Sequence, residues 1–221
     1  MVKMLKSKKH VFWEALLVTI LIFGLGLLFG SAFESLRIDK LNEYYSQSEV
    51  SLMDIIALDR LTDLDYSNCN ILINSNLEFA DKIYEEAKLL EKYDSSGRLS
   101  NSLWGVHKKY DLLRTFLWIN SIKVSNKCKK DFHSLVYLYE YRSPDLAKQA
   151  TQSVWSKILS DLKQEEGRNI VLIPIAVDSN LTSLNSLLKP LNITKYPVVV
   201  IDNKIIVSDL NSVDNLKKYL K

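Results

Sequence analysis

The longest run of hydrophobic residues lies near the start of the chain. Residues 11–30 read VFWEALLVTILIFGLGLLFG and contain a single charged side chain. At about 1.5 Å per residue, a helix of this length matches the roughly 30 Å hydrocarbon core of a bilayer. A helix also satisfies its own backbone hydrogen bonds in lipid. The pattern predicts a transmembrane helix over residues 11–33, preceded by a short tail of residues 1–10.

Charges on either side of this run predict its orientation. Lys3, Lys6, Lys8 and Lys9 precede it with no acidic residue, whereas residues 31–50 carry only Arg37 and Lys40 as basic residues. The positive-inside rule then places the N-terminus in the cytoplasm and the remainder outside it.

A cleaved signal peptide is the alternative interpretation of the same run. Gly30, Ser31 and Ala32 resemble a cleavage site that follows a basic segment. The apolar region of a signal peptide spans about 7–15 residues, however, so the longer run favours an uncleaved signal-anchor.

Residues 34–127 show helical spacing and no alternating strand pattern. A continuation of the first helix, together with one further helix, is expected over residues 36–64. Another helix is expected over residues 76–93, and the next begins near Ser100 after the breaker residues 94–97. The segment is predicted to form a small helical module outside the cytoplasm.

After Cys128 the hydrophobic period changes to one typical of alternating strands and helices. Pro144 is expected in the first turn of the first helix, where its missing N–H costs nothing. The buried face of that helix is expected to contain Leu146, Ala150, Val154, Ile158 and Leu162. The expected elements are a strand at 132–141, this helix ending at Gly167, a strand at 170–178, a helix at 181–188, a hairpin of 197–201 with 205–207, and a helix at 212–220.

Composition excludes several classes of function. The 221 residues are 47% hydrophobic and 25% charged, which suits one large or two small folded domains. The net charge of +3 is spread along the chain, so a nucleic-acid partner is not expected. The two cysteines form no C-x-x-C pair and the three histidines are scattered, so neither a metal nor a cofactor is expected.

The order strand, helix, strand, helix, hairpin, helix, together with LNITKYPVVVIDNKIIV at residues 191–207, resembles the thioredoxin fold. The fold class expected is therefore an α/β thioredoxin-like domain at residues 128–221, after the transmembrane helix and the helical module. The resemblance implies that Pro197 is cis and faces the turn at the start of the first helix. It also implies that the loop of Tyr196 and Pro197 can bind an extended peptide.

The sequence departs from that family where the chemistry should occur. Thioredoxin-like oxidoreductases carry Cys-Pro-x-Cys or a close variant after the first strand, and here the matching residues are Ser143, Pro144, Asp145 and Leu146. Dithiol exchange needs an activated thiolate and a second thiol, and both are missing. Ser143 also lacks a nearby base or nucleophile elbow. We expect Ser143 to be a helix N-cap and the domain to be non-catalytic.

The anchor, the stretch KKYDLLRTFLWI at residues 108–119, and a cysteine just before the first strand are similar to membrane-anchored thioredoxin-like proteins of small-genome archaea. That resemblance implies a pairing of Cys69 with Cys128, which would tie the helical module to the thioredoxin-like domain. From the residues alone, an even cysteine count and an oxidising location favour a structural disulfide. Two buried free thiols and a redox-active pair are the alternatives.

These observations predict a membrane-anchored extracytoplasmic protein without a redox dithiol, acting as a protein-binding or scaffold module. The partners expected are the membrane and a protein or an extended peptide. The alternative is a thiol–disulfide oxidoreductase acting through Cys69 and Cys128. A third hypothesis is a structural subunit that packs through its helical module.

Overall fold

The computed structural model describes residues 8–62, 68–94, 100–128 and 132–220. The chain divides into two compact units, residues 1–43 and residues 44–221. Helix α1, Lys8–Thr62, contributes to both units. The domain boundaries expected from the sequence stay predictions.

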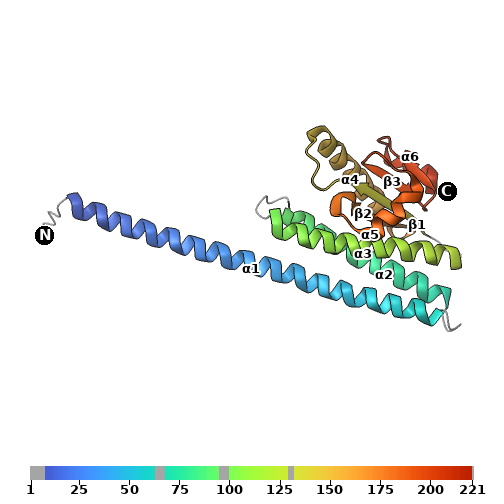
Figure 1. Cartoon of the computed structure of the whole chain (residues 1–221), viewed down its shortest axis with the longest axis horizontal. Helices are drawn as coiled ribbons and strands as arrows, with labels where there is room; N and C mark the ends of the chain where they lie inside the picture. Colours follow the sequence, from blue (N-terminus) through green and yellow to red (C-terminus); the bar gives the residue numbers. More distant parts are fainter. Residues whose placement is uncertain (1–7, 63–67, 95–99, 129–131, 221) are drawn as a thin grey trace. The chain divides into compact units, whose positions relative to one another are not determined.

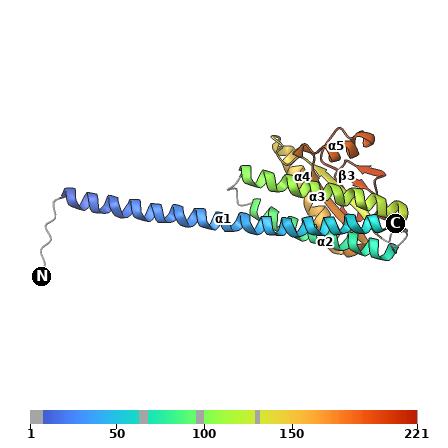
Figure 2. The ribbon, with the colours of Figure 1, turned by 60° about the horizontal axis from the view of Figure 1, so that its bottom comes forward.

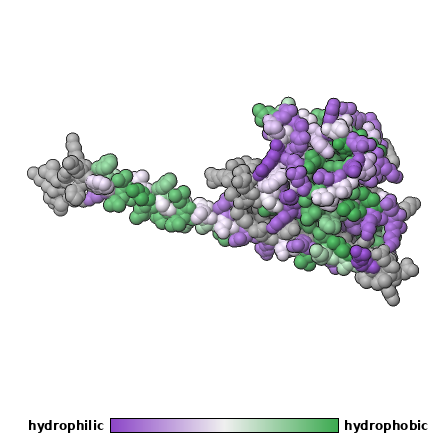
Figure 3. All heavy atoms as spheres, viewed as in Figure 1, coloured by the Kyte–Doolittle hydropathy of each residue, from purple (hydrophilic) through white to green (hydrophobic). Residues whose placement is uncertain are grey.

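The first unit contains the apolar segment. Val11–Leu36 is the part of α1 that is long and apolar enough to cross a membrane, and none of it is buried. Figure 3 shows hydrophobic residues along this apolar part of α1. Length and composition fit a membrane anchor and a signal sequence alike. The structure has one continuous helix as far as Thr62, so the expectation of a further separate helix before residue 62 is wrong.

In the second unit, the C-terminal part of α1, helix α2 (Cys69–Asp94) and helix α3 (Ser100–Lys127) lie side by side (Figures 1 and 2). Helix α2 begins earlier than expected because Asn68 caps it: the Asn68 side chain accepts a hydrogen bond from the Asn70 backbone N–H at 2.9 Å. The expected start of α3 at Ser100 is confirmed. The breaker residues 95–97 lie outside the described residues.

The described residues also contain a four-stranded mixed sheet with strand order β2-β1-β3-β4. Strands β1 and β2 are parallel, whereas β3 pairs antiparallel with both β1 and β4. In this register Leu135 lies opposite Leu172 on one side and Ile201 on the other. The expected strands are present, some of them shorter at their ends. Their bounds are β1 His133–Tyr139, β2 Ile170–Ala176, β3 Val198–Ile201 and β4 Ile205–Val207.

Helices cover both faces of this sheet, which explains why its strands are almost continuously apolar. Leu135 and Tyr137 of β1 belong to a buried cluster that contains residues of helix α4 (Leu146–Glu166) and helix α6 (Val213–Lys217). Helix α3 packs against β1 and β2 and also contacts helix α5, Thr182–Leu188. Short 3-10 helices follow α4, β2, α5 and α6, at Gly167–Asn169, Val177–Ser179, Lys189–Leu191 and Lys218–Leu220.

The buried face of α4 differs from the expected one. Leu146 is 78% exposed and Val154 is 44% exposed. Residues spaced by four drift around a helix by about 40° per step, so Leu146 and Leu162 point about 160° apart. Alternating steps of three and four keep a face aligned, and the large Trp155 lies on that face. The buried residues are Gln152, Trp155, Leu159 and Leu162.

A disulfide joins Cys69 to Cys128, with a Cα–Cα distance of 5.6 Å and a sequence separation of 59. It connects the first residue of α2 to the residue that follows α3. The alternative of two free thiols is therefore wrong for this structure. Only 4% of Cys128 is exposed, so the bond is closed off from solvent on that side.

Removing the bridge should lower the free energy of unfolding. A loop of this length is stabilised by up to about 4 kcal/mol through the lost entropy of the unfolded chain. We expect Cys69→Ser with Cys128→Ser to shift the urea midpoint of the nanodisc-embedded full chain downward, followed by tryptophan fluorescence. Reduced wild-type protein should match the double variant, and a midpoint that reduction leaves unchanged would contradict the assignment.

Candidate functional site

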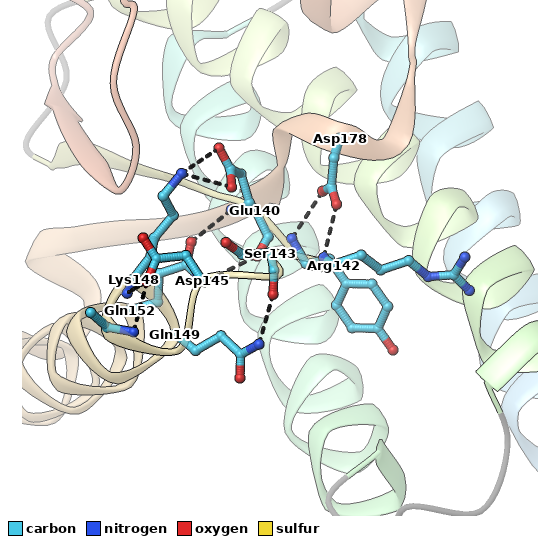
Figure 4. Close-up of polar contacts among 10 residues, drawn as sticks. Glu140, Arg142, Ser143, Asp145, Lys148, Gln149, Gln152 and Asp178 are labelled. Atoms are coloured by element: carbon cyan, nitrogen blue, oxygen red, sulfur yellow. Dashed lines mark hydrogen bonds and ion pairs between the residues drawn. The ribbon is translucent and has the colours of Figure 1, made fainter.

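The loop between β1 and α4, residues 140–145, lies at the carboxyl edge of the two parallel strands (Figure 4). Asp178, just after β2, binds this loop with both carboxylate oxygens. It accepts hydrogen bonds from the backbone N–H of Tyr141 at 2.9 Å and of Arg142 at 2.8 Å. Because an ionised carboxylate forms stronger hydrogen bonds than a neutral acceptor, this contact holds the two strand ends together.

Two glutamines of α4 also hold the loop backbone. The Gln152 amide donates to the Glu140 carbonyl at 3.0 Å and accepts from the Glu140 N–H at 2.8 Å. Gln149 donates to the Ser143 carbonyl at 2.7 Å. Lys148 also lies 2.9 Å from both carboxylate oxygens of Glu140. These contacts explain why a polar residue such as Gln152 is buried, which hydrophobic spacing alone could not predict.

The expected N-cap at Ser143 is wrong, because Asp145 caps α4. Its carboxylate accepts hydrogen bonds from the N–H groups of Ala147 at 2.9 Å and Lys148 at 3.2 Å. A negative charge is favoured at the positive end of a helix, which gives aspartate the advantage over a serine hydroxyl. Pro144 therefore lies before the helix and not in its first turn.

Ser143 is 5% exposed, and its Oγ has no hydrogen-bond partner among the described residues. No general base is therefore in contact with it among those residues. Leu146, at the position where the resemblance would place a second cysteine, projects into solvent. Solvent therefore reaches the apolar side chain of Leu146 but not the hydroxyl of Ser143.

Helix α3 supports the loop through an aromatic cluster. The rings of Trp104 and Tyr141 stack at 5.7 Å, and His107 lies 4.0 Å from the Tyr141 ring. The Arg142 guanidinium lies 4.4 Å from the centre of the Trp104 ring, a favourable cation–π distance. This contact was not predicted from the sequence, in which the only signal is that Trp104, His107 and Asp111 share one face of the helix.

One turn further along α3, buried polar groups bind the end of β2. Asp111 accepts hydrogen bonds from the Ala176 N–H at 3.1 Å and from Arg114 at 3.2 Å. Burial raises the pKa of Asp111 to about 6, against the lowering effect of Arg114 and the Ala176 N–H. Burial and the Arg114 charge together lower the pKa of His107 to about 3. At neutral pH, His107 is therefore neutral and Asp111 is ionised beside Arg114.

Tyr196 and Pro197 precede β3, and the peptide bond between them is cis. The sheet ladder begins at Val198, opposite Leu138. Because Leu138 pairs antiparallel with Val198, Glu140 at the start of the β1–α4 loop lies near Tyr196. Burial and the charge of Glu140 raise the pKa of the Tyr196 hydroxyl. A shallow hollow of about 380 Å³ lies beside Tyr196. It is lined by Asn185, Leu188, Lys189, Asn192, Ile193, Thr194 and Tyr196.

The strand register therefore brings the predicted β1–α4 loop and Tyr196 into one region, whereas the cysteines lie at the ends of α2 and α3. Among the described residues, no group of three or more His, Cys, Asp or Glu side chains could hold a metal ion. The region offers a braced loop, an exposed leucine and an open hollow.

No protein-family model matches this chain. A comparison with curated proteins likewise finds no match.

Asp178 should be required for the rigidity of the β1–α4 loop. Asp178→Ala leaves two backbone donors without their acceptor, at a cost of about 1–3 kcal/mol. We expect faster hydrogen exchange at the amides of Tyr141 and Arg142, whereas Asp209→Ala, a change at an exposed loop carboxylate, should leave them protected. Equal protection of these amides in all three proteins would show that Asp178 does not hold the loop.

His107 should make the protein less stable in acid. Its folded pKa of about 3 lies below its ordinary value of 6.5, so protons favour the unfolded state. Its contribution to stability is complete above pH 6.5 and is lost as the pH falls toward 3. The difference in unfolding free energy between wild type and His107→Gln should therefore shrink by about 1.4 kcal/mol per pH unit below 6.5.

Asp111 has the opposite effect on the free energy of unfolding: its pKa is raised on folding, so protons favour the folded state below pH 6. It is present in both proteins, so comparing them isolates the effect of His107. A difference that stays constant between pH 7 and pH 5 would rule out a buried neutral imidazole.

Proposed function

We propose that this protein is a membrane-anchored, thioredoxin-like protein without a redox dithiol, which binds an extended segment of a protein partner. The strand order β2-β1-β3-β4 supports the fold part of the proposal. Helix α4 connects the parallel strands β1 and β2, and the hairpin of β3 and β4 precedes α6. This is the order of elements in which the sequence resembles the thioredoxin family.

The observation that carries the binding proposal is the position of Tyr196. It is half-buried, it lines the 380 Å³ hollow, and the Glu140 charge acts on its hydroxyl. Residues 194–197 lie outside the sheet ladder, which starts at Val198. Backbone at the end of a sheet can pair with an extended peptide, independently of any sulfur.

Side chains around Tyr196 indicate which peptides would fit. Leu188 and Ile193 give the hollow an apolar wall, and Lys189 adds a positive charge at the same place. Leu146 is exposed at the start of α4 and offers an apolar contact where oxidoreductases have a sulfur. We infer that an extended peptide with an apolar side chain, flanked by an acidic residue, is the preferred ligand.

The remaining parts of the proposal concern location. The apolar helix Val11–Leu36 would anchor the protein, and α1 continues beyond it without a break to Thr62. The lysines before this helix favour a cytoplasmic N-terminus. An extracytoplasmic second unit is consistent with the Cys69–Cys128 bridge, because disulfides persist in oxidising compartments. The resemblance to proteins of small-genome archaea belongs to the same proposal.

Peptide binding should depend on Tyr196. The full chain in nanodiscs is probed with an array of extended ten-residue peptides that vary in apolar and acidic residues. Tyr196→Ala should lower the affinity for the peptides that the wild type retains by about tenfold or more. A tyrosine at the centre of an interface commonly contributes over about 1.4 kcal/mol to binding. Tyr219→Ala, which truncates another partly exposed tyrosine, should leave binding unchanged.

Each variant is first checked for an intact Cys69–Cys128 bridge by mass, so that a loss of folding is not mistaken for a loss of binding. Equal retention by wild type and Tyr196→Ala would contradict the proposed site. Retention of peptides without apolar side chains would contradict the proposed preference.

A further inference from the structure

The second unit contains two Asn-x-Thr triplets in which the middle residue is not proline, NLT at residues 180–182 and NIT at residues 192–194. Such a triplet is the acceptor sequence for N-linked glycans in proteins outside the cytoplasm. Because short triplets also arise by chance, the place of each one in the fold decides whether it can be used. The first triplet leads into helix α5 (Figure 1), and the second follows the 3-10 helix after α5.

The triplet at residues 192–194 lies in an irregular loop. It follows the 3-10 helix that ends at Leu191 and precedes strand β3, which begins at Val198. Asn192 and Thr194 are exposed to solvent, and Ile193 is half-buried. Among the described residues, neither the Asn192 amide nor the Thr194 hydroxyl has a hydrogen-bond partner. A transferase could therefore reach both side chains, and the loop could extend without unwinding a helix.

The triplet at residues 180–182 is held by the fold. Leu181 is only 9% exposed, and Thr182 is the first residue of α5. The Leu181 carbonyl accepts a hydrogen bond from the Asn185 N–H at 3.0 Å, in the first turn of that helix. Extending this triplet would expose Leu181 and unwind the start of α5. Asn180 itself is exposed, so the difference lies in the two residues that follow it.

Backbone conformation explains the asparagine at position 192 but not the threonine at position 194. Asn192 has φ of 51° and ψ of 34°, and asparagine adopts this left-handed conformation more readily than most residues. Thr194 is exposed, and its hydroxyl makes no hydrogen bond within the part of the chain that the structure describes. The exposed threonine two residues after the asparagine is therefore the feature that points to modification.

We propose that Asn192 is the acceptor of an N-linked glycan, transferred from a polyprenyl diphosphate oligosaccharide. The Asn192 Nδ2 forms a bond to the anomeric carbon of the first sugar, and the bond from that carbon to the diphosphate oxygen breaks. The amide loses one proton, and the polyprenyl diphosphate leaves with the electron pair. Asn192 lines the hollow beside Tyr196, so the glycan would be attached at the edge of that hollow. The proposal rests on the proposed extracytoplasmic location of the second unit.

The first experiment tests the folded protein. The full chain in nanodiscs is incubated with an oligosaccharyltransferase that needs only Asn-x-Thr and with its polyprenyl diphosphate oligosaccharide, and glycopeptides are quantified by mass spectrometry. We expect Asn192 to be modified about tenfold faster than Asn180, because exposing the buried Leu181 side chain disfavours the extended form of the other triplet by at least that factor.

Two matched variants complete this experiment, and both change a threonine that is exposed to solvent. Thr194→Val should abolish the modification of Asn192, whereas Thr182→Val should leave it unchanged. Equal rates at Asn180 and Asn192, no transfer to Asn192, or unchanged transfer in Thr194→Val would each overturn the proposal.

The second experiment tests the location separately. The full chain is translated in the presence of rough microsomes, whose lumen carries out the same transfer, and the modified residues are identified by mass. We expect a glycan on Asn192. Asp209→Asn combined with Asn211→Thr places an acceptor triplet in the loop before α6 as a control. Modification of the control triplet but not of Asn192 would overturn the proposal and leave the location standing. If neither is modified, the location is wrong and the proposal fails with it.

Discussion

The packing of α3 against the sheet is the contact on which the rest of the second unit depends. Tyr110, Leu113, Leu117 and Trp118 of this helix are fully or almost fully buried, and Asp111 binds the backbone of β2 at Ala176. Without α3, one apolar face of β1 and β2 would meet water. The helical segment therefore completes the core of the sheet, which is why residues 44–221 form one compact unit. The disulfide secures this arrangement by joining α2 to the end of α3.

The same helix determines what the candidate site can do. Its first turns pack Trp104 and His107 against Tyr141, while Asp178 and two glutamines hold the loop backbone from other sides. A loop braced in this way loses little entropy when it binds a partner. At the two positions where the resemblance would place the cysteines, Ser143 is buried and Leu146 is exposed.

Local patterns in the sequence were sufficient for the apolar helix and for the strands, because each depends on neighbouring residues. A strict spacing of four residues along α4 predicted that Leu146 is buried, but such a spacing turns gradually around the helix. The buried face is the one on which Trp155 packs against the sheet. The choice of Asp145 over Ser143 as N-cap was also readable, since a carboxylate suits a helix start. Contacts between distant segments were not readable: nothing near Asp111 in the sequence indicates that it binds Ala176.

We propose that the protein works by binding a partner, in a fold closed by a structural disulfide, and not by thiol chemistry. Cys128 is buried, and neither cysteine lies in the β1–α4 loop. The most direct measurement is a redox titration of the nanodisc-embedded chain, in which free thiols are alkylated at each potential and counted by mass. We expect the bridge to persist below about −300 mV. A pair that titrates between about −120 and −270 mV would instead identify a redox-active disulfide.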